Sequence, residues 1–397
     1  MVGGGFGGVK AALELAKDRR FHITLISSHS DFRIYGTLYH VATGGARRVS
    51  SIPLTEIFAG TKVKVVIDKV TALDRKARAV ITGSKTSFGY DALVLSLGVT
   101  TNFFHIEGLE EFAYGIKTPD DAEKLKQHLH KQMVGDGRTD LNYVVVGGGP
   151  TGVELAGVLP SYIRKIAKSH GLKPQKVHVD LIEAAPRLLP RMPKDLSKKV
   201  KKHLQKIGIT VRLNKAVQAQ SADALMVDGK PIRSHTVIWT AGVTNNPFFS
   251  AQEFQLTHTG KVRVDQYLQA EPGIYVIGDN ADTPYTGMAQ VAISDAKYVA
   301  KNLVRLADKK EPHPYHAKKP IYVMPAGPGW SAALWGNVRI YGRLGHFLRR
   351  MADYIAYHDY VPWQMALSRW TAEYDDEENC TTCDGKLQRV KYESGEV

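Results

Sequence analysis

Glycines recur at one particular spacing in two segments of this sequence. The first segment is Gly3-Gly4-Gly5-Phe6-Gly7-Gly8 and the second is Gly147-Gly148-Gly149-Pro150-Thr151-Gly152, and both fit the pattern G-x-G-x-x-G. In such a loop the first two glycines let the backbone turn tightly and approach a pyrophosphate, and the third lets a helix pack closely on a strand. The free N–H groups of the following helix then face the phosphates. One match among 36 glycines is weak evidence, but its recurrence predicts two dinucleotide sites.

The second segment also indicates which nucleotide it binds. Residues 143–146 have the character of a buried strand before the glycines, and the alternating run from Val177 to Ile182 predicts the next strand, which ends at Glu183. A carboxylate at the end of this strand accepts hydrogen bonds from both hydroxyls of an adenosine ribose and repels a 2′-phosphate. The second site is therefore predicted to bind NADH in preference to NADPH.

The matching strand of the first segment ends at Ser27 without an acid, so only one hydrogen bond to a ribose is expected there. The nucleotide predicted for this first site is FAD, because a downstream strand ends at Gly278-Asp279 and a helix follows near residues 287–290. In flavoproteins with two dinucleotides, such an aspartate hydrogen-bonds the ribityl chain and the helix N-terminus faces the pyrimidine carbonyl of the flavin. The alternative for Asp279 is a helix N-cap or turn residue.

Strands and helices that can position these loops alternate along most of the chain. This alternation predicts an α/β fold with twisted parallel sheets and two Rossmann-like dinucleotide-binding domains. The FAD domain is expected to be discontinuous, over residues 1–115 and 255–315, with the NADH domain inserted at residues 116–254. Residues 316–397 are expected to form a C-terminal segment for membrane association or interface formation, in which Pro362 ends or kinks a helix, followed by a polar, mobile tail.

Composition excludes several classes of protein. The 397 residues are enough for two or three domains, and 43% hydrophobic and 23% charged residues exclude general disorder. Two cysteines exclude a disulfide-stapled secreted scaffold. A net charge of +14 suits an anionic partner, whether nucleic acid, acidic lipid or a phosphate-bearing ligand. Nucleic acid is not expected, because no zinc-finger or RNP signature is present and the lysines of residues 194–202 are typical of a solvated helix face.

Further segments extend the pattern from Gly3 to about Val304, in an order and spacing more specific than any one of them. They are Leu38-Tyr39-His40-Val41-Ala42-Thr43-Gly44, Asp91-Ala92-Leu93-Val94-Leu95-Ser96-Leu97-Gly98, Lys117-Thr118-Pro119-Asp120-Asp121-Ala122, Ala184-Ala185-Pro186-Arg187-Leu188-Leu189-Pro190, Trp239-Thr240-Ala241-Gly242-Val243 and Ala289-Gln290-Val291-Ala292. With these segments the chain resembles the type II NADH dehydrogenases. These are single-subunit flavoproteins of the pyridine nucleotide-disulfide oxidoreductase-like superfamily. They pass electrons from NADH through FAD to a quinone without pumping protons.

The resemblance implies roles for individual residues. Glu154 is implied at the active site and Gln290 beside the flavin and the quinone. The alternatives are a first-turn acid favoured by the helix dipole and a polar residue at a helix start. It implies FAD contacts by Gly3, Gly5, Phe6, Gly8, Ser27, Thr43, Gly98, Gly278, Asp279, Ala289 and Gln290. It implies NADH contacts by Gly147, Gly149, Pro150, Thr151, Gly152, Glu183, Ala241 and Gly242. No metal is expected. The chain departs from the family at Ser27, at Gly36 where proline is common, and in lacking a Lys-Gly-Met-Ala stretch after residue 320.

The position of the cysteines bears on which other flavoprotein activities are possible. No cysteine lies between Gly3 and Gly278, so flavin disulfide chemistry and sulfide oxidation lack their nucleophile. An NADH oxidase, a ferredoxin-type NADH reductase, and a basic flavoprotein that senses redox state or binds a partner stay as alternatives. Cys380 and Cys383 form the one CxxC, for which free thiols are favoured over a zinc knuckle.

A quinone dissolved in lipid requires the flavin to approach a membrane. Apolar residues at helical spacing between Phe347 and Ile355, together with the positive charge, predict peripheral association with an anionic membrane surface at the cytoplasmic face. The alternative is that this stripe packs on the FAD domain. The sequence is compatible with a homodimer and does not identify the quinone.

The start of the chain is short for the predicted fold. Met1 and Val2 alone precede the first glycines, whereas a parallel strand usually has about five residues. We therefore expect the biological chain to begin several residues upstream of Met1.

Overall fold

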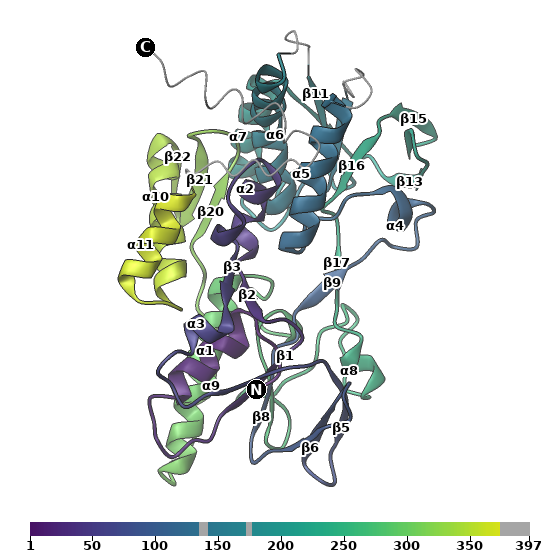
Figure 1. The fold of residues 1–397 in the computed structure, drawn as a ribbon. Helices are drawn as coiled ribbons and strands as arrows, with labels where there is room; N and C mark the ends of the chain where they lie inside the picture. The colour runs from purple at the N-terminus through teal and green to yellow at the C-terminus, as the bar shows by residue number, and fades with distance from the viewer. Residues whose placement is uncertain (135–141, 172–176, 374–397) are drawn as a thin grey trace.

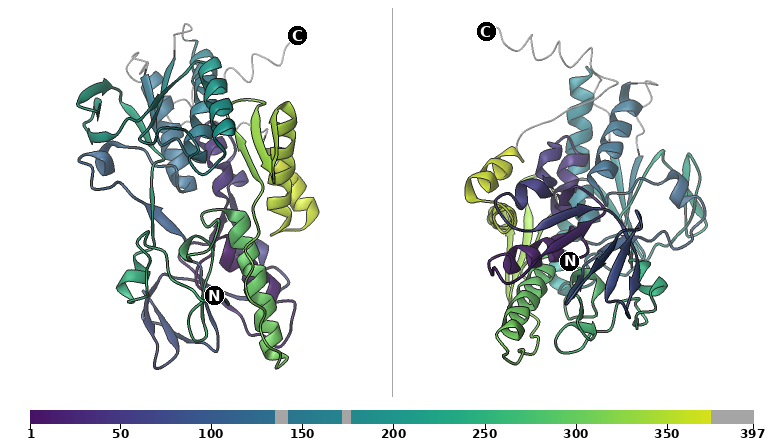
Figure 2. Two further views of the ribbon diagram at one scale, coloured as in Figure 1. Left: turned by 180° about the vertical axis from the view of Figure 1, so that it is seen from behind. Right: turned by 60° about the horizontal axis from the view of Figure 1, so that its bottom comes forward.

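The computed structural model describes residues 1–134, 142–171 and 177–373, and it has two lobes joined by two antiparallel strands (Figure 1). The connecting strands are β9 (Val99–Thr101) and β17 (Val243–Asn245). The C-terminal helices α10 (Arg343–His358) and α11 (Trp363–Ala372) lie along the side of the molecule in both figures (Figure 2). The expected polar tail and the CxxC at Cys380 and Cys383 lie outside the described residues.

The first lobe is built around a sheet whose strands come from two distant parts of the chain. Val2 bridges β1 (Thr24–Ser27) on one side and β8 (Leu93–Leu95) on the other, all in parallel. Next to β1 lies β4 (Lys64–Ile67), and next to β8 lie β19 (Ile274–Val276) and β18 (Gln269–Glu271). Because β19 follows the whole second lobe in sequence, the predicted discontinuous α/β architecture is confirmed, while its exact boundaries stay predictions.

Two helices cover this sheet side by side. They are α1 (Phe6–Leu15) and α9 (Ala289–Ala307), whose small and branched residues Val9, Ala12, Ala296 and Val299 are buried. The remaining elements of this lobe are β2 (Asp31–Arg33), η1 (Tyr35–Thr37), α2 (Leu38–Ala42), η2 (Arg47–Val49), β3 (Ser51–Pro53), α3 (Leu54–Ile57), β5 (Val70–Asp74), β6 (Ala79–Thr82), β7 (Ser87–Gly89), α8 (Phe248–Ala251) and η3 (Gly278–Asn280).

The second lobe holds a parallel sheet of four strands in the order β12-β11-β10-β16. The strands are β10 (Asn142–Val146), β11 (His178–Glu183), β12 (Ile209–Leu213) and β16 (Thr236–Trp239). The helices are α4 (Leu109–Phe112), α5 (Pro119–Val134), α6 (Pro150–Ser169) and α7 (Lys194–Lys206). An antiparallel sheet is added by β13 (Val217–Gln220), β14 (Ala224–Val227) and β15 (Lys230–Arg233).

The C-terminal segment touches both lobes. It consists of an antiparallel sheet, β20 (Tyr322–Pro325), β21 (Ser331–Trp335) and β22 (Val338–Gly342), followed by α10 (Arg343–His358) and α11 (Trp363–Ala372). Pro362 is the N-cap of α11, so the predicted helix break is confirmed. The hydroxyl of Tyr360 donates to the carbonyl of Phe6 at 2.9 Å, and Gly157 of α6 lies so close to Gly327 that a Cβ at Gly157 would be 2.5 Å from the Gly327 nitrogen. Among the described helices, none combines the length and apolar character that a membrane crossing requires.

The two glycine loops have nearly the same geometry. Gly3 and Gly147 have φ of +110° and +114°, a conformation that side chains disfavour. A Cβ at Gly8 would lie 2.0 Å from the Gly3 carbonyl oxygen, and a Cβ at Gly152 would lie 1.9 Å from that of Gly147. The third glycine of each loop is thus required for the helix to begin against the strand end.

We expect Gly152→Ala to lower the thermal unfolding midpoint of the protein, because the added methyl group must displace the backbone at Gly147. Overpacking of this kind costs about 1–3 kcal/mol or more. The matched control is Gly149→Ala, since no atom lies within 4 Å of a Cβ there; it should lose no more than about 1 kcal/mol through the poorer N-cap. Circular dichroism melts of both variants test this, and equal midpoints would contradict it.

Candidate active site

The first glycine loop ends where α1 begins, and its middle glycine faces open space. Gly5 is the N-cap of α1, has no side-chain cap, and has no atom within 4 Å of the position of a Cβ. Phe6 starts the helix, but its ring is buried between Phe32 and Tyr360, with centroids at 5.0 and 5.8 Å. The backbone of this turn, with its uncapped N–H groups, is therefore the part that can meet a phosphate.

Ser27 lies directly beneath the first loop. It is 3% exposed, and its hydroxyl donates to the His29 carbonyl at 2.7 Å and accepts from the His29 N–H at 3.2 Å. A hydroxyl oxygen has two lone pairs, so one acceptor position is left for a ribose hydroxyl. The single hydrogen bond expected from the sequence stays a prediction.

The turn at Gly278 and Asp279 is brought against Gly98 by an asparagine. The side chain of Asn280 accepts from the Gly98 N–H at 2.9 Å and donates to the Gly98 carbonyl at 2.7 Å. The Gly278 N–H donates to the buried carboxylate of Asp295 at 3.0 Å. Asn280 and Asp295 were not predicted from the sequence, although Asn280 directly follows the Gly278-Asp279 pair.

Two lysines flank Asp279. Burial lowers the pKa of Lys117 and of Lys261, and the Asp279 carboxylate opposes this effect in both. The ammonium of Lys117 lies 4.7 Å from the ring centroid of Tyr35. The sequence gives no sign that Lys117 lies close to Asp279, and the structure brings the two together.

The side chains of Gln290 and Thr43 form hydrogen bonds with backbone groups. Gln290 donates to the Ile321 carbonyl at 3.0 Å and accepts from the Ile321 N–H at 3.1 Å, which ties the start of α9 to the strand before β20. The hydroxyl of Thr43 donates to the Tyr39 carbonyl at 2.8 Å. Ala289 and Gln290 are both exposed at the helix start. The contact of Gln290 with flavin or quinone stays a prediction.

The second glycine loop gathers its predicted residues at the carboxyl ends of three neighbouring strands. Gly149, the uncapped N-cap of α6, faces open space, and Pro150 and Thr151 follow it, exposed, in the first turn. A Cβ at Gly147 would lie 2.8 Å from the Ala241 nitrogen. Gly242, which comes next, has φ of +109° and faces the ring of Phe104.

Glu183 lies at the end of β11 with its carboxylate held by backbone. Its Oε2 accepts from the Gly148 N–H at 2.6 Å and its Oε1 from the Ala185 N–H at 2.7 Å. The neighbouring cations are engaged elsewhere: Arg187 donates to the carbonyls of Leu189 and Met192, and Lys215 pairs with Asp228 at 2.7 Å. The negative charge of Glu183 is thus in direct contact with this loop.

Glu154 is buried between α6 and the C-terminal segment. It is 7% exposed, and its Oε1 lies 3.3 Å from Nη1 of Arg349 on α10. Burial raises the pKa of Glu154 to about 7, although Arg349 acts to lower it. Arg349 and Arg350 are also buried, so these two cations face inward.

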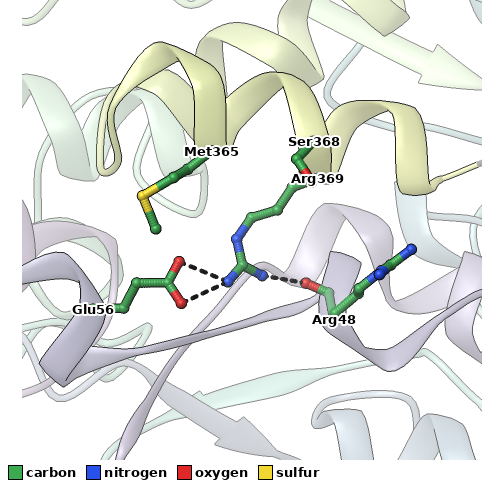
Figure 3. Close-up of a pocket in the computed structure, with 5 residues that line it drawn as sticks. All are labelled: Arg48, Glu56, Met365, Ser368 and Arg369. Carbon is green, nitrogen blue, oxygen red and sulfur yellow. Dashed lines mark hydrogen bonds and ion pairs between the residues drawn. The ribbon is translucent and has the colours of Figure 1, made fainter.

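A small cavity of about 190 Å³ lies where α11 meets η2 and α3 (Figure 3). In it, Arg369 donates to both carboxylate oxygens of Glu56, at 2.8 and 3.1 Å, and to the Arg48 carbonyl at 2.6 Å. Because these contacts occupy Arg369, the cavity marks where α11 is anchored to the first lobe.

Comparison with known proteins agrees with this geometry. Residues 1–296 match the pyridine nucleotide-disulphide oxidoreductase family. A type II NADH:quinone oxidoreductase, NdhA of Mycobacterium tuberculosis, is 31% identical over 336 residues, which are 77% of this chain and 71% of that protein. A type II NADH:quinone oxidoreductase of Staphylococcus epidermidis is 25% identical over 89% of this chain and 93% of its own length. The structure of NDH2 from Plasmodium falciparum in complex with NADH is similar in fold, with a TM-score of 0.83 and 18% identity over 94% of this chain and 96% of that chain.

The family model covers residues 1–296, which are most of the chain, and the relative from Mycobacterium tuberculosis is above 30% identity. The chain therefore belongs to the pyridine nucleotide-disulphide oxidoreductase family and, within it, to the type II NADH:quinone oxidoreductases.

Proposed function

We propose that this protein transfers a hydride from NADH to FAD and passes the electrons to a quinone, without pumping protons. The observation that carries the proposal is the pair of glycine loops, each followed by an uncapped helix N-terminus that faces open space. One loop has the Asp279 turn beside it and the other has Glu183. Membership of the type II NADH:quinone oxidoreductases supports the same conclusion.

FAD fits the first lobe. Gly5 and the first turn of α1 can meet its pyrophosphate, Ser27 its adenosine ribose, and Asp279 its ribityl chain. When bound, FAD accepts two electrons as a hydride and gives them up in a separate step. The positive charge of Lys117 and Lys261 near Asp279 favours an electron-rich group here.

The residues of this chain position the reactants. Because hydride transfer needs no protein acid or base, the task of both loops is to hold the nicotinamide and the flavin against each other. NADH, a quinone and one proton give NAD⁺ and a hydroquinone, so one proton must be taken up in each turnover. Glu154 is a buried carboxyl group beside the second loop with a pKa of about 7.

Peripheral membrane association is the second part of the proposal, and helix α10 supports it. This helix is amphipathic, but its charged face is buried and its apolar face is exposed. Phe347 and Ile355 are each 58% exposed, whereas Arg349, Arg350 and Tyr357 are buried. Leu344 on α10 and Trp363 and Leu367 on α11 are exposed as well. The alternative that the whole stripe packs on the first lobe does not fit these exposures.

The positive charge for such a surface comes from a neighbouring helix. Exposed lysines lie on α7, at residues 194, 198, 199 and 202, and the ammonium of Lys199 is 5.8 Å from the ring of Tyr341 on β22. An anionic leaflet attracts basic groups near its surface by about 1 kcal/mol each. Since the cytoplasmic leaflet is the anionic one, we place the protein on the cytoplasmic face.

The activity is tested with purified, yellow protein by following NADH oxidation with a water-soluble quinone, with oxygen and with a one-electron acceptor. We expect stoichiometric FAD and the highest rate with the quinone. A rate with oxygen or with a one-electron carrier that equals or exceeds the quinone rate would overturn the proposal in favour of an oxidase or a ferredoxin-type reductase.

Nucleotide preference follows from Glu183. We expect kcat/KM to favour NADH over NADPH strongly, and Glu183→Gln to narrow the ratio by about tenfold or more, because repulsion of the 2′-phosphate is removed. The matched control is Glu110→Gln, an exposed acid on α4 of the same lobe. Equal efficiency of the two nucleotides with unaltered protein would contradict this role.

Membrane binding is tested by sedimentation with anionic liposomes. Phe347→Ser with Ile355→Ser should lower the bound fraction, because each removes exposed apolar area from α10. The control is Ile67→Ser, which changes an exposed apolar residue of the first lobe. High salt should also weaken binding; insensitivity to salt would count against the role of the lysines.

A further inference from the structure

One guanidinium joins four separate parts of the molecule. Arg349 of α10 is 8% exposed, and its Nη2 donates to the Gly36 carbonyl at 2.7 Å. Its Nη1 lies 3.3 Å from Oε1 of Glu154 and 3.4 Å from the Val323 carbonyl, and its Nε donates to Asp353 at 2.8 Å. The first lobe, the second-lobe helix α6, β20 and α10 are therefore held through a single side chain.

We propose that Arg349 is a positioning residue that fixes Glu154 at the active site, so that the C-terminal segment completes this site as well as docking the protein. The inference rests on the proposed function, since it concerns the carboxylate beside the NADH loop. Arg349 acts through Glu154 and Asp353.

The shape of the side chain suits this role. A guanidinium is planar and presents five N–H donors in a rigid fork, which allows it to bond groups in several directions at once. Here the three nitrogens of Arg349 contact two carboxylates, those of Glu154 and Asp353. They also contact two backbone carbonyls, those of Gly36 and Val323. A lysine has one nitrogen on a flexible stem and cannot reproduce this arrangement.

The charge balance of the cluster links Arg349 to the proton on Glu154. Two carboxylates, Glu154 and Asp353, share one guanidinium in a buried place. The closer pair is Arg349 with Asp353, at 2.8 Å against 3.3 Å for Glu154. Burial raises the pKa of both carboxyl groups, and the more distant Glu154 is the group that takes the proton as pH falls toward 7.

Other titratable and charged groups lie around this cluster. On α2, burial lowers the pKa of His40 to about 3 and raises the pKa of Tyr39 far above the neutral range. On α10, burial lowers the pKa of His346, and Arg350 pairs with Glu373. On α5, which also packs on α6, the buried Lys126 pairs with Glu123 at 2.9 Å. A transition near pH 7 is therefore assigned to Glu154 by its loss in Glu154→Gln.

Removing the two partners of Glu154 must shift its titration in opposite directions. Arg349 lowers the pKa of Glu154 and Asp353 raises it. Arg349→Gln should therefore move the transition to higher pH and Asp353→Asn to lower pH, each by about one unit or more, since a charge within 4–6 Å has effects of this size. A residue that only supported the fold would lower activity at every pH without moving the transition.

The experiment follows NADH oxidation with a water-soluble quinone by the holoenzyme at a series of pH values, because the proton of each turnover is taken up as the quinone is reduced. We expect a transition near pH 7 that Glu154→Gln abolishes, that Arg349→Gln raises and that Asp353→Asn lowers. Arg349→Lys should keep the transition close to its place, because the charge is retained, yet slow the reaction. Arg343→Gln removes an exposed arginine of the same helix and should change nothing.

A second readout does not depend on activity. Because the pKa of Glu154 is raised from 4.5 to about 7 on folding, the folded protein holds a proton that the unfolded chain releases above about pH 4.5. The unaltered protein should therefore lose stability relative to Glu154→Gln as pH rises from about 4.5 to about 7. Arg349→Gln should extend this window upward and Asp353→Asn should shorten it.

The outcomes separate the two proposals. If quinone is not reduced but the melting temperatures follow these shifts, the proposed function fails, while the coupling of Arg349 and Asp353 to the proton on Glu154 stands. If the transition has the same pH in Arg349→Gln, Asp353→Asn and the unaltered protein, the role of Arg349 is overturned. If Arg349→Gln does not retain flavin, Asp353→Asn still tests the direction in which the transition moves along the pH axis, because this variant keeps the guanidinium of Arg349.

Discussion

The close approach of backbone to backbone inside each glycine loop is the constraint on which the rest of this structure depends. The third glycine lies against the carbonyl of the first, with no room for a methyl group at Gly8 or Gly152. This contact starts α1 and α6 directly at the ends of their strands and leaves the first N–H groups of both helices without protein partners. Each lobe then presents a positive helix end at the carboxyl edge of its sheet, which is where α/β proteins bind nucleotides.

This part of the protein could be predicted from sequence because its signals are local. A glycine loop spans six residues, and the acid at residue 183 follows the second loop at a regular distance along one strand–helix–strand unit. The periodicity of α10 and the break at Pro362 are also local, and both were predicted correctly. The fold class follows from repeating such units, and the family resemblance agrees with it.

The remaining contacts could not be predicted, because they join residues that are far apart in sequence. Asn280 meets Gly98 across 182 positions, and Arg349 meets Glu154 across 195. No spacing rule connects such pairs. The burial of the charged face of α10 could not be predicted either, because the charged residues of an amphipathic helix are usually the exposed ones. Here the helix buries Arg349 and Arg350 and exposes Phe347.

The inverted orientation of α10 is held by its polar face. Arg349 is engaged by Glu154 and Asp353, and Arg350 by Glu373 and the carbonyl of Trp370. Removing one partner of a buried ion pair costs about 3–5 kcal/mol, so a helix rolled over to bury Phe347 would leave several charges unpaired inside. The apolar face of α10 therefore cannot be buried against the protein without breaking these ion pairs, and it stays exposed to solvent or to a partner. Under the two proposals made above, the guanidinium that holds Glu154 also determines which face of α10 a membrane can meet. Membrane docking and active-site geometry would then depend on one helix orientation.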